Sequence, residues 1–201
     1  MKPTLSDFVL VENVFTEEFC KKAINILEMN EWQTHGWYGK SPTGGKVITM
    51  EGSDFAVNHH MGLQNLMIPY VKQFLEVYVS KINKNNPWLY GCGNYKDDQP
   101  ERLVEQYSGI RFNRYDEGKL IKKHIDHIHS IFDGDRKGIP VLSLVGVFND
   151  DYEGGEFVMW DDTVIPLKTG DIVAFPSVFM YQHQVKPVTK GSRYSWVQWT
   201  F

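Results

Sequence analysis

Hydrophobic residues in the first hundred positions follow helical spacing in two segments. The first stripe comprises Phe19, Ala23, Ile24 and Leu27. Thr16 precedes it as a candidate N-cap, and Glu17 and Glu18 stand where they complement the helix dipole. The second stripe comprises Met61, Leu66, Tyr70, Phe74, Val77, Tyr78 and Ile82. Pro69 lies within this stripe and predicts a kink or a restart of the helix.

From Leu103 onward the pattern changes to short runs of β-branched and aromatic residues separated by turn residues. The runs predict strands over residues 108–115, 118–125, 139–148, 155–160, 163–167, 171–176, 179–185 and 193–201. Short strands with no helical interval are typical of an antiparallel sandwich or jelly roll. We therefore expect a mainly β protein with flanking helices (α+β). It would be a double-stranded β-helix, or jelly roll, with the N-terminal helices packed on the larger sheet.

The chain has 201 residues, the length of one domain. We expect a single domain over residues 1–201. In it, residues 1–100 would supply helical support and loops, and residues 103–201 would form the jelly-roll catalytic core. The segments 31–58 and 84–101 are rich in turn residues, and we expect loops there, either of which could serve as a lid or a substrate-binding edge.

Three histidines lie in or beside the first of these loops. His35, His59 and His60 have no partner at the spacing of metal ligands. We therefore expect all three to be solvated side chains without a role in the site.

Composition narrows the range of functions. The shares of apolar residues, 42%, and of charged residues, 23%, are those of a folded globular protein and exclude extensive disorder. A net charge of −4 argues against binding of nucleic acid through a broad basic surface. The two cysteines, Cys20 and Cys92, are too few for a disulfide framework or a thiolate metal site.

Two features bear on location. The N-terminal residues lack the sustained apolar stretch of a signal peptide. The longest apolar run, residues 141–148, is far too short to cross a bilayer. We therefore expect a cytoplasmic protein without membrane association, and no feature of the sequence bears on its oligomeric state.

Candidate metal ligands begin with His124 and Asp126, which strand alternation places on one face. Alone, this pair is as readily a histidine hydrogen-bonded to a local carboxylate. His183, which follows in a later strand, favours a metal site, because two imidazoles and one carboxylate leave open positions that suit non-haem Fe(II). Structural zinc would need four ligands, usually with thiolate. His127 and His129 alternate away from His124 and are expected to lie outside the ligand set.

Polar residues also alternate inward on two other strands. Arg193 and Ser195 share one face of the last strand, and an inward arginine is costly unless it meets an anion such as a carboxylate. The alternative for Arg193 is a surface position on an edge strand. Arg111, Asn113 and Tyr115 share one face of the strand before the His124 segment, where Asn113 and Tyr115 can donate hydrogen bonds to a small polar ligand.

Several motifs together resemble the 2-oxoglutarate- and Fe(II)-dependent oxygenases, in particular their prolyl 4-hydroxylase-like branch. The matching pieces are FNRYDEG, HID, FNDDYEGGEF, GDIVAFP and HQVKPVTKGSR. They lie within residues 103–201, and residues 8–27 carry a weaker similarity. Two positions depart from the branch, because Ile121 and Val147 stand where many prolyl hydroxylases have tyrosine.

The resemblance implies a role for each site residue. In the family, the H-x-D motif and the distal histidine hold iron, which corresponds to His124, Asp126 and His183. The basic residue about ten positions later binds the far carboxylate of 2-oxoglutarate and corresponds to Arg193. The co-substrate contacts of related dioxygenases correspond to Asn113, Tyr115 and Ser195.

The resemblance also implies Fe(II) as cofactor, 2-oxoglutarate and O2 as co-substrates, and ascorbate as a reductant. The expected reaction is hydroxylation of an unactivated C–H bond in a peptide, with peptidyl proline the first expectation, or in a small molecule. The alternatives are a nucleic-acid dealkylase, which would need a basic groove, a metal-dependent isomerase, which would not need Arg193, and a non-catalytic jelly-roll binding module.

Overall fold

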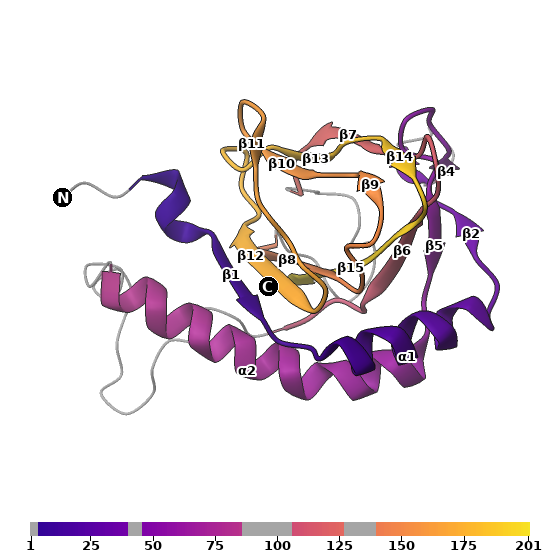
Figure 1. Ribbon diagram of the computed structural model, residues 1–201. Coiled ribbons are helices and arrows are strands. Elements are labelled where there is room, and N and C mark those ends of the chain that lie inside the picture. Colours follow the sequence, from indigo (N-terminus) through magenta and orange to yellow (C-terminus); the bar gives the residue numbers. More distant parts are fainter. Residues whose placement is uncertain (1–3, 40–45, 86–105, 127–139) are drawn as a thin grey trace.

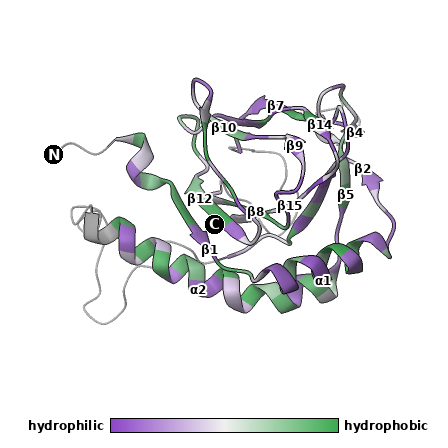
Figure 2. Ribbon diagram, viewed as in Figure 1, coloured by the Kyte–Doolittle hydropathy of each residue, from purple (hydrophilic) through white to green (hydrophobic). Residues whose placement is uncertain are grey.

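Two helices lie along the same side of the molecule, beneath a pair of sheets (Figure 1). The computed structural model describes residues 4–39, 46–85, 106–126 and 140–201. A 3₁₀ turn, η1, occupies Leu5–Phe8, helix α1 spans Glu17–Glu28 and helix α2 spans Met61–Asn85. Hydrophobic and hydrophilic residues alternate along both helices (Figure 2), as expected of helices that bury one face.

Helix α1 begins as the sequence predicts. The Thr16 hydroxyl accepts a hydrogen bond from the Phe19 amide at 3.2 Å, which satisfies one of the free amides of the first turn. The buried face comprises Cys20, Ala23 and Leu27. Burial raises the pKa of the Cys20 thiol to about 12, with smaller contributions from Glu17 and Asp171, so this cysteine is an inert core residue.

The buried face of α2 differs from the predicted stripe. The sequence predicts a kink or a restart at Pro69, and the helix is continuous through Pro69, which excludes the restart. Four members of the stripe are exposed: Met61, Leu66, Tyr70 and Val77. The buried face comprises Leu63, Met67, Val71, Phe74, Leu75, Tyr78 and Ile82. Apolar residues occur on more than one face of this helix, so their spacing alone does not determine which face meets the sheet.

The larger sheet has seven strands in the described residues. Its order is β1 (Leu10–Asn13), β12 (Asp171–Pro176), β8 (Leu142–Val147), β15 (Arg193–Thr200), β6 (Arg111–Tyr115), β5 (Ala56–Asn58) and β2 (Gln33–Thr34). All of its neighbouring pairs are antiparallel. Every strand predicted for residues 103–201 is present in part, and the jelly-roll expectation is confirmed.

The smaller sheet faces the larger one and carries part of the candidate site. Its order is β11 (Thr163–Val164), β10 (Phe157–Met159), β13 (His183–Val185) and β7 (Ile121–His124). Two further antiparallel pairs are β9 (Glu153–Gly154) with β14 (Val188–Lys190) and β3 (Trp37–Gly39) with β4 (Lys46–Ile48).

Two hydrophobic clusters hold these layers together. The first lies between the helices and the outer face of the larger sheet, where Leu27 and Met67 meet Leu144 and Trp196. This confirms that the helices pack on the larger sheet. The second lies between the two sheets and includes Phe175 of β12 and Phe157 of β10. The sheets therefore enclose an interior that is largely apolar, and polar side chains within it need an explanation.

The segment before residue 100 contributes more than helices and loops. Strands β1, β5 and β2 join the larger sheet, and β5 lies directly beside β6. These strands have two to four residues each. So short a run shows no clear alternation of polar and apolar residues. The predicted loop at 84–101 lies outside the described residues apart from its first two positions. Among the described helices, none is both long and apolar enough to span a membrane.

Candidate metal centre

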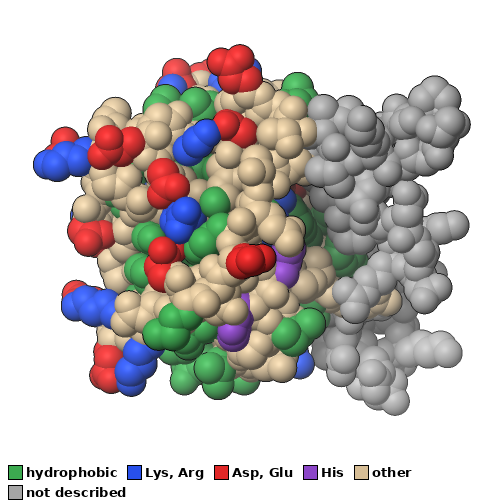
Figure 3. Space-filling model, turned by 90° about the vertical axis from the view of Figure 1, so that its right-hand side faces the viewer, with side chains coloured by type: hydrophobic (Ala, Val, Ile, Leu, Met, Phe, Trp, Pro, Cys, Tyr) green, Lys and Arg blue, Asp and Glu red, His purple; other side chains and the backbone are tan. Residues whose placement is uncertain are grey.

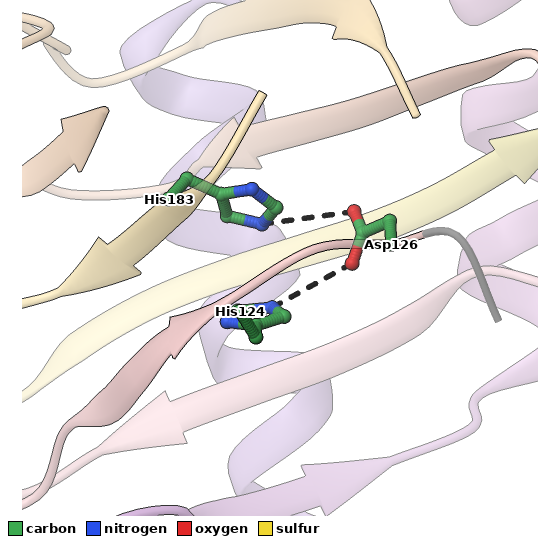
Figure 4. Close-up of side chains that lie close together, drawn as sticks. All are labelled: His124, Asp126 and His183. Atoms are coloured by element: carbon green, nitrogen blue, oxygen red, sulfur yellow. Dashed lines mark ion pairs between the residues drawn. The ribbon is translucent and has the colours of Figure 1, made fainter. Parts of the chain in front are cut away.

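The predicted ligands come together at one end of the smaller sheet (Figure 4). His124 ends β7, His183 begins β13, and the two residues are direct partners in the antiparallel pairing. Asp126 follows His124 by two residues and lies between the two rings. Its Oδ1 is 3.5 Å from Nε2 of His124, and its Oδ2 is 3.6 Å from Nε2 of His183. The ligand atoms of all three side chains lie within 4.8 Å of one another.

The other nitrogen of each ring fixes its tautomer. Nδ1 of His124 lies 2.8 Å from the Lys122 carbonyl oxygen, and Nδ1 of His183 lies 3.0 Å from the Tyr181 carbonyl oxygen. A carbonyl oxygen only accepts, so each Nδ1 carries the proton, and Nε2 of the neutral ring presents its lone pair. Burial lowers the pKa of His183 to about 4, partly offset by Asp126, which keeps this ring neutral at pH 7.

Asp126 supplies the negative charge between these lone pairs. Burial alone would raise the pKa of its carboxyl group, but His183, His124 and the nearby Ser143 hydroxyl hold that pKa well below its usual range. Its Oδ2 is buried without a hydrogen-bond partner in the described part of the chain. A buried carboxylate facing two nitrogen lone pairs is an arrangement that a cation stabilises. Two imidazoles and one carboxylate without thiolate fit Fe(II) with open coordination positions.

Arg193 lies inside the roll rather than at its surface. It is 1% exposed, and its Nη1 donates to the Ser195 hydroxyl at 2.7 Å. Its Nε and Nη2 are buried and have no partner among the described residues. Strand β15 is flanked by β8 and β6, so the edge-strand alternative is excluded. The two orphaned donors fit a carboxylate that the described residues do not supply.

Asn113 and Tyr115 lie beside Arg193 and Ser195. In the pairing of β6 with β15, Tyr115 is opposite Arg193 and Asn113 is opposite Ser195. The guanidinium carbon of Arg193 is 5.5 Å from the centre of the Tyr115 ring. Burial raises the pKa of Tyr115 to about 12, although the charges of Arg193 and Arg111 lower it. The phenol therefore stays protonated at pH 7 and can donate a hydrogen bond. Of these four residues, Arg193 lines a cavity of about 200 Å³, together with residues between 150 and 168.

The structure corrects the expectation for two histidines. His35 is buried, its Nδ1 lies 2.7 Å from the Ser53 carbonyl oxygen, and its ring stacks on Phe55 at 4.3 Å. Nδ1 of His60 accepts the Leu63 amide at 2.9 Å in the first turn of α2. Neither residue is a solvated side chain. Both roles depend on tertiary or capping contacts that a loop sequence does not signal.

His59 is exposed, as predicted, whereas His127 and His129 lie outside the described residues.

Arg111, which the sequence places on the inner face without a role, also lies between the two sheets. Its guanidinium carbon lies 5.4 Å from the ring centre of Trp199 and 5.8 Å from that of Phe55.

Comparison with known proteins finds a family model that matches the C-terminal part of the chain. Residues 110–201, which contain all seven predicted site residues, are similar to the 2OG-Fe(II) oxygenase superfamily. The name of that superfamily states dependence on Fe(II) and 2-oxoglutarate, which agrees with the donor set of the cluster and with the orphaned donors of Arg193.

Two curated relatives are named as hydroxylases. A PKHD-type hydroxylase of Delftia acidovorans is 39% identical over 99 residues, which cover 45% of this chain and 42% of the relative. Another, of Aliarcobacter butzleri, is 24% identical over 94% of this chain and 76% of the relative. The chain thus spans less than half of the Delftia protein.

The solved structures share the fold. A Trichoplax adhaerens prolyl hydroxylase, solved with a peptide fragment of hypoxia inducible factor, has a TM-score of 0.62 at 14% identity, covering 98% of this chain and 84% of that one. A Pseudomonas putida prolyl-4-hydroxylase has a TM-score of 0.61 at 14% identity, covering 96% and 91%. The protein therefore has a prolyl hydroxylase-like fold along nearly its whole length.

Proposed function

We propose that the protein is a 2-oxoglutarate- and Fe(II)-dependent dioxygenase that hydroxylates an unactivated C–H bond. One oxygen atom of O2 enters the substrate as a hydroxyl group, and the other enters succinate as 2-oxoglutarate loses CO2. The observation that carries the proposal is that one interior contains both a cluster of metal-ligand side chains and a buried arginine without an acidic partner among the described residues. The cluster of His124, Asp126 and His183, in which Asp126 and His183 are buried, would be stabilised by a cation, and the buried Arg193 would be stabilised by an anion.

In this proposal, His124, Asp126 and His183 hold the iron through Nε2, one carboxylate oxygen and Nε2. Bound Fe(II) supplies the redox chemistry that activates O2. The Lys122 and Tyr181 carbonyl oxygens orient the two rings by accepting their Nδ1 protons. The protein thus presents the ligand atoms in a fixed geometry before the metal binds.

Arg193 and its neighbours would position the co-substrate. Nε and Nη2 of Arg193 would donate to the distal carboxylate of 2-oxoglutarate, while Ser195 holds the guanidinium through Nη1. The Tyr115 phenol and the Asn113 amide nitrogen are further donors on the neighbouring strand. Asn113 Oδ1 accepts a hydrogen bond from Arg111 Nε at 3.1 Å. This bond fixes the orientation of the amide and leaves its nitrogen to donate to another group.

The proposed substrate is a peptide or a small molecule. The names of the relatives and the solved structures, hydroxylases and prolyl hydroxylases, support peptidyl proline as the first substrate to try. Mass spectrometry after incubation with proline-rich peptides and with free amino acids decides between the two classes. Gain of oxygen by a free small molecule alone would exclude the peptidyl substrate. Ascorbate as reductant remains a prediction, tested by omitting it.

Three alternatives are weaker on specific grounds. A metal-dependent isomerase has no use for an unpartnered arginine in the roll. A non-catalytic binding module would bind no 2-oxoglutarate, whereas the orphaned nitrogens of Arg193 suit its distal carboxylate. A nucleic-acid dealkylase needs a basic groove, whereas acidic and basic side chains are interspersed on the face drawn in Figure 3 and the net charge is −4.

The decisive experiment is an anaerobic titration of the Fe(II) protein with 2-oxoglutarate, followed by the metal-to-ligand charge-transfer absorption. We expect the absorption to develop in the wild type and to be lost in His124→Ala, Asp126→Ala and His183→Ala, together with 2-oxoglutarate turnover. His59→Ala is the matched control, because this histidine is exposed and outside the cluster. Absence of the absorption in the wild type would refute the proposal, and full activity of one cluster variant would remove that residue from the ligand set.

A further inference from the structure

Arg111 is a second cation on the inner face of the roll, separate from Arg193. In the pairing of β6 with β15, Arg111 is opposite Val197, whereas Arg193 is opposite Tyr115. Four residues of strand separate Arg111 from Tyr115, which is about 14 Å at about 3.4 Å per residue. The backbone positions of the two arginines therefore differ by two pleats along the sheet.

Arg111 lies toward the metal end of this interior. Its guanidinium carbon is 5.4 Å from the ring centre of Trp199. Trp199 is paired with Ser143, whose hydroxyl is close enough to Asp126 to lower the pKa of that carboxyl group. The charges of Arg111 and Asp126 also act on each other directly. A ligand that meets Arg111 would therefore be close to the metal cluster.

The terminal nitrogens of Arg111 have no partner in the described residues. The one hydrogen bond of its side chain runs from Nε to Asn113 Oδ1, and Nη1 and Nη2 make neither a hydrogen bond nor an ion pair with any described group. Arg111 is half-buried, and burial lowers its pKa despite the opposing effects of Tyr115 and Asp126. A half-buried guanidinium with no acidic side chain at ion-pair distance among the described residues is stabilised by an anion.

The components of the proposed reaction leave this charge unmatched. Fe(II) carries two positive charges and Arg193 one, while Asp126 carries one negative charge and 2-oxoglutarate two. These charges cancel among themselves. His35 adds none at pH 7, because burial lowers its pKa to about 4, with Arg111 acting in the same direction. Arg111 thus leaves a net charge of +1 beside the position where the substrate must bind.

We propose that Arg111 binds a carboxylate of the substrate, so that the enzyme hydroxylates a molecule with a carboxylate near the reacting carbon rather than a neutral peptide segment. This inference rests on the proposed function. The planar guanidinium lies over the rings of Trp199 and Phe55, and its two terminal nitrogens match a carboxylate in a paired hydrogen-bonding geometry. The other source of a carboxylate in this interior is 2-oxoglutarate itself, and the test separates the two.

The test uses acetate and acetamide as probes, because they share a shape and differ in charge. Each is titrated into the anaerobic Fe(II) protein saturated with 2-oxoglutarate, and the charge-transfer absorption and the midpoint of thermal unfolding are both recorded. The variants are Arg111→Gln and Arg111→Lys. Arg114→Gln is the matched control, since Arg114 is on the same strand, faces the opposite side and is paired with Glu28 at 3.0 Å.

We expect acetate, and not acetamide, to change both signals in the wild type and in Arg114→Gln. The acetate affinity should fall by about 30-fold or more in Arg111→Gln and by less in Arg111→Lys. The affinity for 2-oxoglutarate should fall by much less than the acetate affinity, because Arg111 acts on the co-substrate only through its hydrogen bond to Asn113. Equal responses to acetate and acetamide, or an undiminished acetate response in Arg111→Gln, would overturn the proposal. So would a fall in 2-oxoglutarate affinity in Arg111→Gln as large as the fall in acetate affinity, which would assign Arg111 to the co-substrate. A wild type without the charge-transfer absorption would instead refute the proposed function.

Discussion

Replacement of Arg193 by methionine should stabilise the ligand-free protein and abolish its response to 2-oxoglutarate. Nε and Nη2 of Arg193 are buried without partners in the described structure, and the side chain is 1% exposed. Leaving a buried polar group unsatisfied costs about 1–3 kcal/mol, and more when the group is charged. Methionine has a similar length and no charge, so Arg193→Met removes that cost while it keeps most of the packing.

The magnitudes follow from the size of the chain. For a protein of this length, about 1 kcal/mol corresponds to roughly 2–4 °C in the unfolding midpoint, so the ligand-free variant should melt about 2–12 °C above the wild type. At a 2-oxoglutarate concentration about 100 times its dissociation constant, the wild type gains about 2.7 kcal/mol, or roughly 5–11 °C. Loss of a buried charged contact costs about 2–5 kcal/mol, a weakening of about 30-fold or more. At the same concentration, the variant would therefore gain about 1 kcal/mol at most.

Differential scanning calorimetry of the anaerobic Fe(II) protein, with and without 2-oxoglutarate, measures both effects in one series. Arg193→Lys is the control for charge without the planar geometry, and it should keep part of the 2-oxoglutarate response. A ligand-free Arg193→Met that melts below the wild type and still gains the full 2-oxoglutarate shift would refute the reasoning. Iron content should be the same in all three proteins, since Arg193 does not belong to the ligand cluster.

Two further predictions concern stability. Burial lowers the pKa of His35 from 6.5 to about 4 in the folded chain, so the unfolded chain binds more protons between these pH values. His35 should therefore lower the free energy of unfolding by about 2 kcal/mol from pH 7.5 to 5. In urea unfolding, His35→Gln, which keeps a donor for the Ser53 carbonyl oxygen, should lack this part of the loss. Gly146→Ala would place its Cβ 2.2 Å from the ring of the fully buried Trp196, which should cost about 1–3 kcal/mol and lower the unfolding midpoint; an unchanged midpoint would contradict the close packing at this position.

The C-terminal half of the fold is the part that sequence patterns predict well. Strands β8, β12 and β15 have six to eight residues, long enough for runs of β-branched and aromatic residues to be recognised. Strands β2 and β5 have two and three residues, and no periodicity can be read from them. Their inclusion in the larger sheet depends on pairing with β6, which is a tertiary contact.

The candidate site shows the same division. Strand alternation and spacing are enough to predict His124, Asp126 and His183 as ligands, because histidine and aspartate are common metal ligands whatever their surroundings. The burial of His35 cannot be predicted from the sequence, because it depends on contacts with residues about twenty positions later. These contacts are the stacking of its ring on Phe55 and the hydrogen bond to the Ser53 carbonyl oxygen. Arg111 was placed on the correct face by alternation, but only the structure shows that its terminal nitrogens have no described partner.

Arginine side chains on the inner face of the larger sheet destabilise the fold and therefore bear on function. The inner face of the larger sheet contains Val145, Val173 and Val197, residues that stabilise a roll by burial alone. Arg111 and Arg193 interrupt that face with guanidinium groups that form no ion pair with a described residue. Proteins place such polar groups in an apolar interior mainly at functional sites, where a ligand supplies the missing partner. The two positions lie on neighbouring strands, four strand positions apart. They fit the two anionic groups proposed above, the distal carboxylate of the co-substrate at Arg193 and a carboxylate of the substrate at Arg111.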